Sequence, residues 1–203
     1  MPRPTLSARP LAALVAALLG AGCLDDPLPS PGLGPQADQP ATCDEKCQDG
    51  VALRSVREAM KLVYNLTLQG KPVGFQSAST PCPEGGSADV QGNATSNAEQ
   101  GATQVYLTYT FHDCVYRQID SDLDERDENY VMKLDGVISQ SGLIAVQPSA
   151  TTALLIASDS LSLEGQVYSP PTSYQASECV LQVSQSGDEI AGTFCTREAG
   201  FTF

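Results

Sequence analysis

The sequence predicts an α+β fold that is mainly β, with one N-terminal helix packed on a curved antiparallel sheet or open barrel and stapled by disulfides. Apolar residues recur with the helical period of 3.6 only between Asp49 and about Gln69. After Pro72 the period changes to two, and no helical segment separates the period-two stretches. Consecutive strands with such short links are expected to pair antiparallel.

The start of the chain has the order of a secretory signal. Arg3 and Arg9 precede a charge-free apolar stretch over residues 11–19, and small residues follow up to Cys23. The apolar stretch is shorter than the roughly 20 residues that a transmembrane helix needs. We therefore expect the protein to be exported.

The end of this segment, Leu18-Leu19-Gly20-Ala21-Gly22-Cys23, resembles a bacterial lipobox over the first 23 residues, with Gly20 where Leu is usual. The resemblance implies a bacterial lipoprotein whose signal peptide, residues 1–22, is removed and whose Cys23 carries acyl chains such as palmitate. It further implies a membrane partner through that lipid. We expect a cell-envelope protein, at the outer rather than the inner membrane.

Residues 23–41 are predicted to form a lipidated cysteine and a disordered tether, because five prolines with Gly, Ser and Asp cannot bury a core. Residues 42–203 then form a single globular domain. Removal of residues 1–22 takes two of the 11 basic side chains and none of the 24 acidic ones, which leaves a formal charge of −15. Such a charge argues against a nucleic-acid partner.

The predicted helix spans 49–69 and has one apolar stripe, which should face the core: Leu53, Val56, Met60, Val63 and Thr67. Gly70-Lys71-Pro72 has the chemistry of a helix end. The clearest strand is 105–112, where apolar and polar residues alternate strictly. The other predicted strands are 87–95, 130–140, 151–157, 159–169, 178–185 and 189–196.

Four of these strands contain an apolar-x-Gly-x-apolar pattern, centred on Gly92, Gly136, Gly165 and Gly192. Glycine weakens a strand, so its recurrence on one face indicates bends or the close approach of another element. A coincidence of composition is the alternative, because glycine is common in this chain.

After lipidation of Cys23, an even six cysteines remain, which in an exported protein predicts disulfides. Hairpins place Cys82 near Cys114 and Cys179 opposite Cys195, and elimination leaves Cys43–Cys47. The hydrophobic alternation prefers registers one residue away, with Leu181 opposite Phe194 and Val90 opposite Leu107. A bulge near the strand ends would reconcile the two. A zinc site is disfavoured, since only Cys43 and Cys47 cluster.

An acidic run provides one weak metal candidate. Asp120, Asp122 and Asp124 imitate the opening of an EF-hand calcium loop. The imitation fails at Glu125, where glycine is required, and at Val131, where a bidentate carboxylate is required. A solvated loop between strands is therefore the preferred interpretation, and calcium the alternative.

No motif indicates catalysis or a bound cofactor. The one imidazole, His112, lies on the mostly polar face of a predicted strand, and no serine has a nucleophile-elbow pattern. We expect a non-catalytic structural or interaction role, with an envelope protein as a possible partner.

The alternative is a carrier of a hydrophobic ligand, because a helix before a curved antiparallel sheet is similar in architecture to lipoprotein carriers such as LolA and LolB. An apolar lining between sheet and helix would favour the carrier, a filled core the interaction module, and a polar cleft around His112 an enzyme.

The lipoprotein hypothesis predicts that Cys23→Ser abolishes acylation. The variant should no longer partition into the detergent phase, whereas Cys47→Ser, which leaves the lipobox intact, should still do so. Unchanged partitioning of the Cys23 variant would contradict the hypothesis.

Overall fold

The computed structural model describes residues 42–97, 102–120, 123–145 and 153–202. Within these residues it has one α-helix and eight strands, which confirms the mainly β, α+β class. The elements in chain order are α1 (Glu45–Thr67), β1 (Gly74–Pro81), β2 (Ser87–Asn97), β3 (Ala102–Gln118), the 3₁₀ segment η2 (Leu123–Glu128), β4 (Tyr130–Ala145), β5 (Ala153–Val167), β6 (Thr172–Ser186), β7 (Glu189–Phe194) and β8 (Arg197–Thr202).

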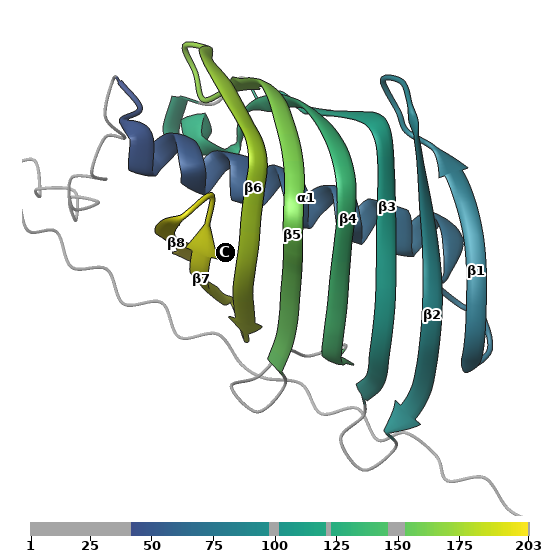
Figure 1. The fold of residues 1–203 in the computed structure, drawn as a ribbon. Helices are drawn as coiled ribbons and strands as arrows, with labels where there is room; N and C mark the ends of the chain where they lie inside the picture. The colour runs from purple at the N-terminus through teal and green to yellow at the C-terminus, as the bar shows by residue number, and fades with distance from the viewer. Residues whose placement is uncertain (1–41, 98–101, 121–122, 146–152, 203) are drawn as a thin grey trace, which may run out of the picture. The chain divides into compact units, whose positions relative to one another are not determined.

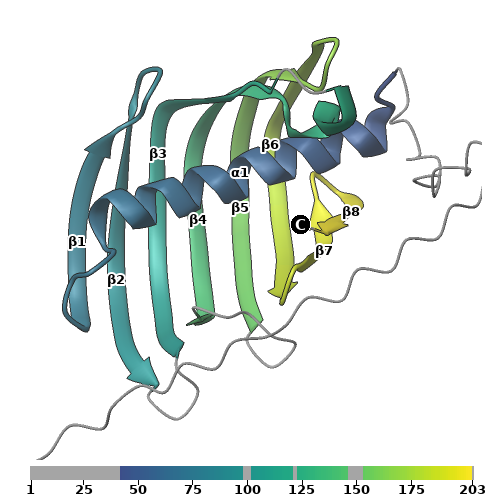
Figure 2. The same cartoon turned by 180° about the vertical axis from the view of Figure 1, so that it is seen from behind.

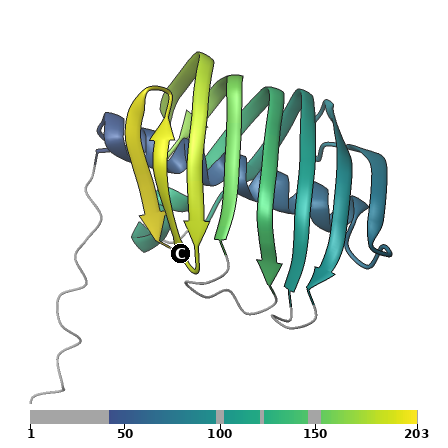
Figure 3. The same cartoon turned by 60° about the horizontal axis from the view of Figure 1, so that its bottom comes forward.

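The eight strands form one antiparallel sheet in which each strand pairs with its neighbours in sequence, from β1 to β8 (Figure 1). β1 and β8 do not pair with each other, so the sheet is not closed. Of the two predicted forms, the curved sheet and the open barrel, the structure has the curved sheet. α1 crosses one face of the sheet, from β8 to β1 (Figure 2). Figure 3 shows the strands curving around the helix.

α1 begins four residues before the predicted start because Asp44 caps it. The Asp44 carboxylate accepts a hydrogen bond from the Cys47 backbone N–H at 2.9 Å. The first turn carries no residue of the apolar stripe, so periodicity alone did not reveal it. The stripe itself is buried as predicted, and its four apolar members lie in one cluster with the inward-facing residues of β3.

Two strands were missed in the sequence. β1 and β8 are the edges of the sheet, and their sequences lack a clear apolar alternation because much of each strand is exposed. The predicted strands 151–157 and 159–169 are one strand, β5, interrupted by a register shift between Ser158 and Leu161. The remaining strands lie where the sequence predicts them; β2, β3, β4 and β6 are longer than predicted, and β7 ends two residues earlier.

The glycine pattern reflects close approach between neighbouring strands. Gly92 and Gly192 have φ of 147° and 153°, which favours glycine over any other residue. A Cβ at Gly92 would lie 2.0 Å from the Tyr106 carbonyl oxygen, and one at Gly192 would lie 2.3 Å from that of Gln182. The element that approaches these glycines is the adjacent strand and not the helix.

The three bridges in the structure are the pairs predicted from the sequence: Cys43–Cys47, Cys82–Cys114 and Cys179–Cys195. The register conflict is resolved at the strand ends. The sheet shifts register between Phe111 and Cys114, and the Cys195 N–H donates to the Val180 carbonyl at 2.9 Å just after β7 ends. Irregular backbone therefore lets the cystines form without moving the apolar faces.

Only one of the two predicted cross-strand pairs is present. Leu181 lies opposite Phe194, as expected. Val90 opposite Leu107 is wrong, because Val90 pairs with Tyr109. The β2–β3 ladder runs to the pair Asn97 and Ala102, in a register two residues from the predicted one, and a shift of two leaves each side chain on its predicted face.

One buried ion pair fixes the start of α1 to the far edge of the sheet. The Asp49 side chain, 2% exposed, has Oδ2 2.7 Å from Nε of Arg197 in β8 and Oδ1 2.9 Å from its Nη2. The Tyr174 hydroxyl of β6 donates to Oδ1 at 2.8 Å. Burial and this carboxylate raise the pKa of Tyr174. Because the Asp49 carboxylate is buried, its charge and its hydrogen-bonding capacity depend on both Arg197 and Tyr174.

Asp49→Asn should lower the free energy of unfolding by about 2–3 kcal/mol, because the half-exposed Arg197 loses a bidentate buried carboxylate. Urea denaturation measures the effect. Glu45→Gln is the matched control, since Glu45 is the exposed partner of the same guanidinium at 3.0 Å and should cost less than about 1 kcal/mol. Equal losses for the two variants would show that burial of Asp49 contributes nothing.

Candidate functional site

A cavity of about 260 Å³ lies between the second half of α1 and the inner face of the sheet. Residues of four strands, of one turn and of one side of the helix line it. The lining residues are Arg57, Met60, Lys61, Tyr64 and Asn65 of α1, Tyr109 of β3, Gln140, Leu143 and Ile144 of β4, Leu154 and Ile156 of β5, Gln185 of β6, and Gly187 of the following turn.

The lining is mainly apolar and has a few polar groups in fixed positions. The Tyr109 hydroxyl donates to Oε1 of Gln140 at 2.8 Å, and burial raises the pKa of this tyrosine. Gln185 donates to the Gly187 carbonyl at 3.3 Å. These bonds hold both amides in place at the wall of the cavity.

The Gln140 amide is a donor in this lining that a ligand could use. No sealed side-chain nitrogen or oxygen lacks a hydrogen-bond partner in the described part of the chain. No partner of the Gln140 amide nitrogen is seen among the described residues, and Gln140 lines the cavity. An apolar cavity with a few convergent polar groups is the usual form of a small-molecule site.

The size of the cavity limits its occupant. A dry engineered cavity of about 150 Å³ holds benzene, and drug-sized ligands occupy sites of about 300–1,000 Å³. The present cavity falls between the two. A second cavity of about 160 Å³, next to the end of α1, shares only Tyr64 with the first. Within the described residues the Tyr64 hydroxyl has no hydrogen-bond partner, and burial raises its pKa.

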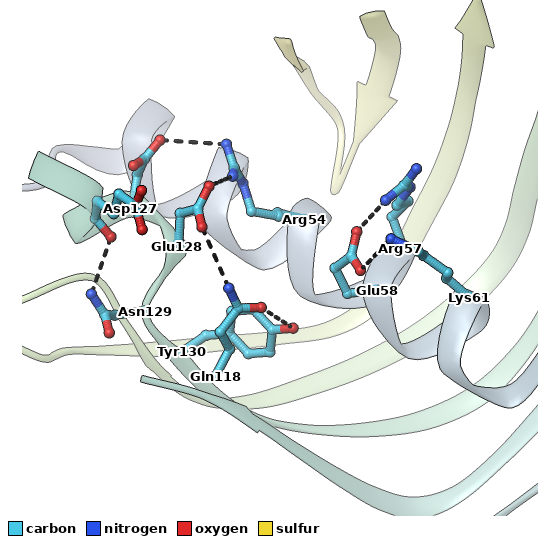
Figure 4. Close-up of polar contacts among 10 residues, drawn as sticks. Arg54, Arg57, Glu58, Lys61, Gln118, Asp127, Glu128, Asn129 and Tyr130 are labelled. Carbon is cyan, nitrogen blue, oxygen red and sulfur yellow. Dashed lines mark hydrogen bonds and ion pairs between the residues drawn. The ribbon is translucent and has the colours of Figure 1, made fainter. Parts of the chain in front are cut away.

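Arg57 and Lys61 are the charged side chains of the cavity lining in the described part of the chain, and both are cationic. Both contact the carboxylate of the partly buried Glu58, Lys61 at 3.4 Å (Figure 4). Lys61 is 54% exposed, so its ammonium group reaches solvent as well as the rim. A neighbouring cavity of about 320 Å³ shares Arg57, Lys61 and Gln185 and has a mixed charged lining that includes Glu128 and Asp188.

The acidic run 120–129 is tied to the helix by ion pairs. Nη1 of Arg54 lies 2.6 Å from Glu128 Oε1, and Nη2 lies 3.5 Å from Asp127 Oδ2 (Figure 4). Gln118 donates to the other oxygen of Glu128 at 3.5 Å and accepts from the Tyr130 hydroxyl at 3.5 Å. Burial raises the pKa of Tyr130 to about 12. The run is thus in part a docking segment for α1 and not only a solvated loop.

The calcium candidate is only partly within the described residues. The Asp120 backbone N–H donates to Oδ1 of Asn129 at 2.6 Å. Asp122 lies outside the described residues, and Asp124 belongs to η2. Among the residues that the structure describes, no cluster of three potential metal-ligating side chains occurs.

His112 lies on the outer face of the sheet, away from the cavity. Its Nε2 is 3.0 Å from Oδ2 of Asp89, and both side chains are about half exposed. Ser79 also donates to the Asp89 carboxylate. The carboxylate therefore stands between the hydroxyl and the imidazole, which is not the order in which a histidine activates a serine.

The sequence predicted none of the residues that line the cavity as site residues. Two signals pointed to them. Gln140 occupies an inward position at the end of a predicted strand, where an apolar side chain is expected, and Tyr64 adjoins the apolar stripe of the predicted helix. Neither signal could show that the two lie on opposite walls of one cavity.

No α-helix in the described part of the chain is long and apolar enough to cross a membrane. Cys23 and the predicted tether lie outside the described residues. The chain matches no protein-family model, no curated protein and no solved structure.

Proposed function

We propose that this chain is an exported, lipid-anchored binding protein that carries a small hydrophobic ligand in the cavity between α1 and the sheet. One observation carries the proposal: a largely apolar cavity of about 260 Å³ lies at the junction of helix and sheet, where a filled core would be the alternative. The lipobox-like segment ending at Cys23 supports the anchor at a bacterial envelope.

Three features of the cavity support ligand binding over a packing defect. Side chains from α1 and four strands converge on it, so a ligand would contact both layers of the fold. The Gln140 amide, at the wall of the cavity, offers a directional hydrogen bond within a mainly apolar lining. The rim carries the charged groups, so a ligand can keep a polar end in water while its apolar part is buried.

A structural or interaction role without a bound ligand is the second candidate, and the outer face of the sheet favours it. Phe75, Tyr106 and Leu155 are exposed large side chains. Cross-strand pairing through Asn93 and Ser141 places them in one row across β1 to β5. An exposed apolar row on an otherwise polar face is typical of a surface that docks another protein.

A cavity-filling substitution tests the binding proposal. Leu154→Phe places a ring in the cavity and should weaken binding of the neutral fluorescent probe N-phenyl-1-naphthylamine by about tenfold, since it occupies the volume that the probe needs. Leu155→Phe is the matched control, because the neighbouring side chain points to the outer face.

Fluorescence titration of the full-length chain gives both affinities. Loss of binding in the Leu154 variant alone supports the cavity as the site. No binding by the unmodified chain, or an equal loss in both variants, would contradict the carrier and leave the interaction role.

A further inference from the structure

We propose that the ligand is a single-chain amphiphile with a carboxylate head, held by Arg57 and Lys61 at the rim, and with a chain length limited by Tyr64. This inference rests on the proposed function of the cavity as a ligand site and names the chemical class of its occupant.

The first argument is the sign of the charge at the rim. The whole chain has 11 basic and 24 acidic side chains, so acidic side chains are expected to outnumber basic ones around a site. The cavity lining nevertheless contains two cations, and within the described residues it contains no acidic side chain. Glu58, which contacts both, offsets one of these two positive charges, and the remaining positive charge favours an anionic group over a cationic one.

The second argument is the spacing of the two cations on α1. Arg57 and Lys61 are four residues apart and therefore lie on the same side of the helix, one turn from each other. Arg57 offers a planar fork of donors that matches a carboxylate, and Lys61 offers an exposed ammonium group. Glu58 contacts both, so a bound head would share these cations with Glu58 or displace it from them.

The third argument concerns the shape of the buried part. The cavity runs from this rim to the inner face of the sheet, where Leu154 and Ile156 provide apolar wall. Its volume suits one short chain and not two long ones. Tyr64 is the side chain that the cavity shares with the 160 Å³ cavity beyond it, so its ring limits how far a chain can extend.

Competition against N-phenyl-1-naphthylamine on the full-length chain tests the head group, with decanoate, decanol and decyltrimethylammonium as competitors below their aggregation concentrations. Decanoate should bind roughly five- to tenfold more tightly than decanol, and the cation should bind most weakly. The preference for decanoate should fall at high salt, because screening weakens contacts with exposed charges.

The double variant Arg57→Gln, Lys61→Gln should bind decanoate and decanol equally. Lys46→Gln, Arg117→Gln is the matched control, because it removes two exposed cations away from the cavity and changes the net charge equally. Preference lost in both variants would show a general charge effect and overturn the assignment of the head group.

Tyr64→Ala should shift the preferred carboxylate, within a series from six to sixteen carbons, to a longer chain. Leu66→Ala, exposed on the same helix, should leave the series unchanged. An unchanged series in the Tyr64 variant would overturn the assignment of Tyr64 as the length limit.

The outcomes separate the two proposals. Equal or tighter binding of decanol, or tighter binding of the cation, overturns the carboxylate amphiphile while the carrier function stands. Failure of the probe and of every competitor to bind overturns both.

Discussion

The need for one helix to cover one sheet governs this structure. A single open sheet has two faces, and among the described elements α1 is the one that lies across the inner face and excludes water from it. The helix has 23 residues and is about 34 Å long. Eight strands at a spacing of about 4.8 Å span about the same distance. A helix that lies across the strands is therefore long enough to contact the sheet from one edge to the other.

The same geometry explains the cavity. A helix with its side chains is about 10–12 Å wide, whereas the central strands of 15–17 residues are about 50 Å long. The strands curve around the helix (Figure 3), and glycines such as Gly92 and Gly192 within the strands allow neighbouring strands to approach closely. Where the helix surface and the curved sheet do not meet, apolar side chains such as Leu154 and Ile156 line an open space.

Fixed contacts at both sides of α1 keep the layers in register. Asp49 binds Arg197 and Tyr174 at the β8 side, and Arg54 binds Asp127 and Glu128 beside η2. These contacts are polar and directional, unlike the apolar stripe, which would tolerate small rotations of the helix. They orient the helix so that Arg57 and Lys61 meet the rim of the cavity, which connects the stability of the fold to the proposed ligand site.

The sequence by itself determined the helix, the order and antiparallel pairing of the central strands, and the three disulfides. Periodicity decides which face of an element is buried, and short links decide which strands are neighbours. It did not reveal β1 and β8, because exposed edge strands need no apolar alternation. Only the tertiary structure brought Asp49 to Arg197, 148 residues away, and Tyr64 to the cavity beside Gln140. Such contacts depend on the curvature of the whole sheet and the placement of the helix across it, which no local pattern encodes.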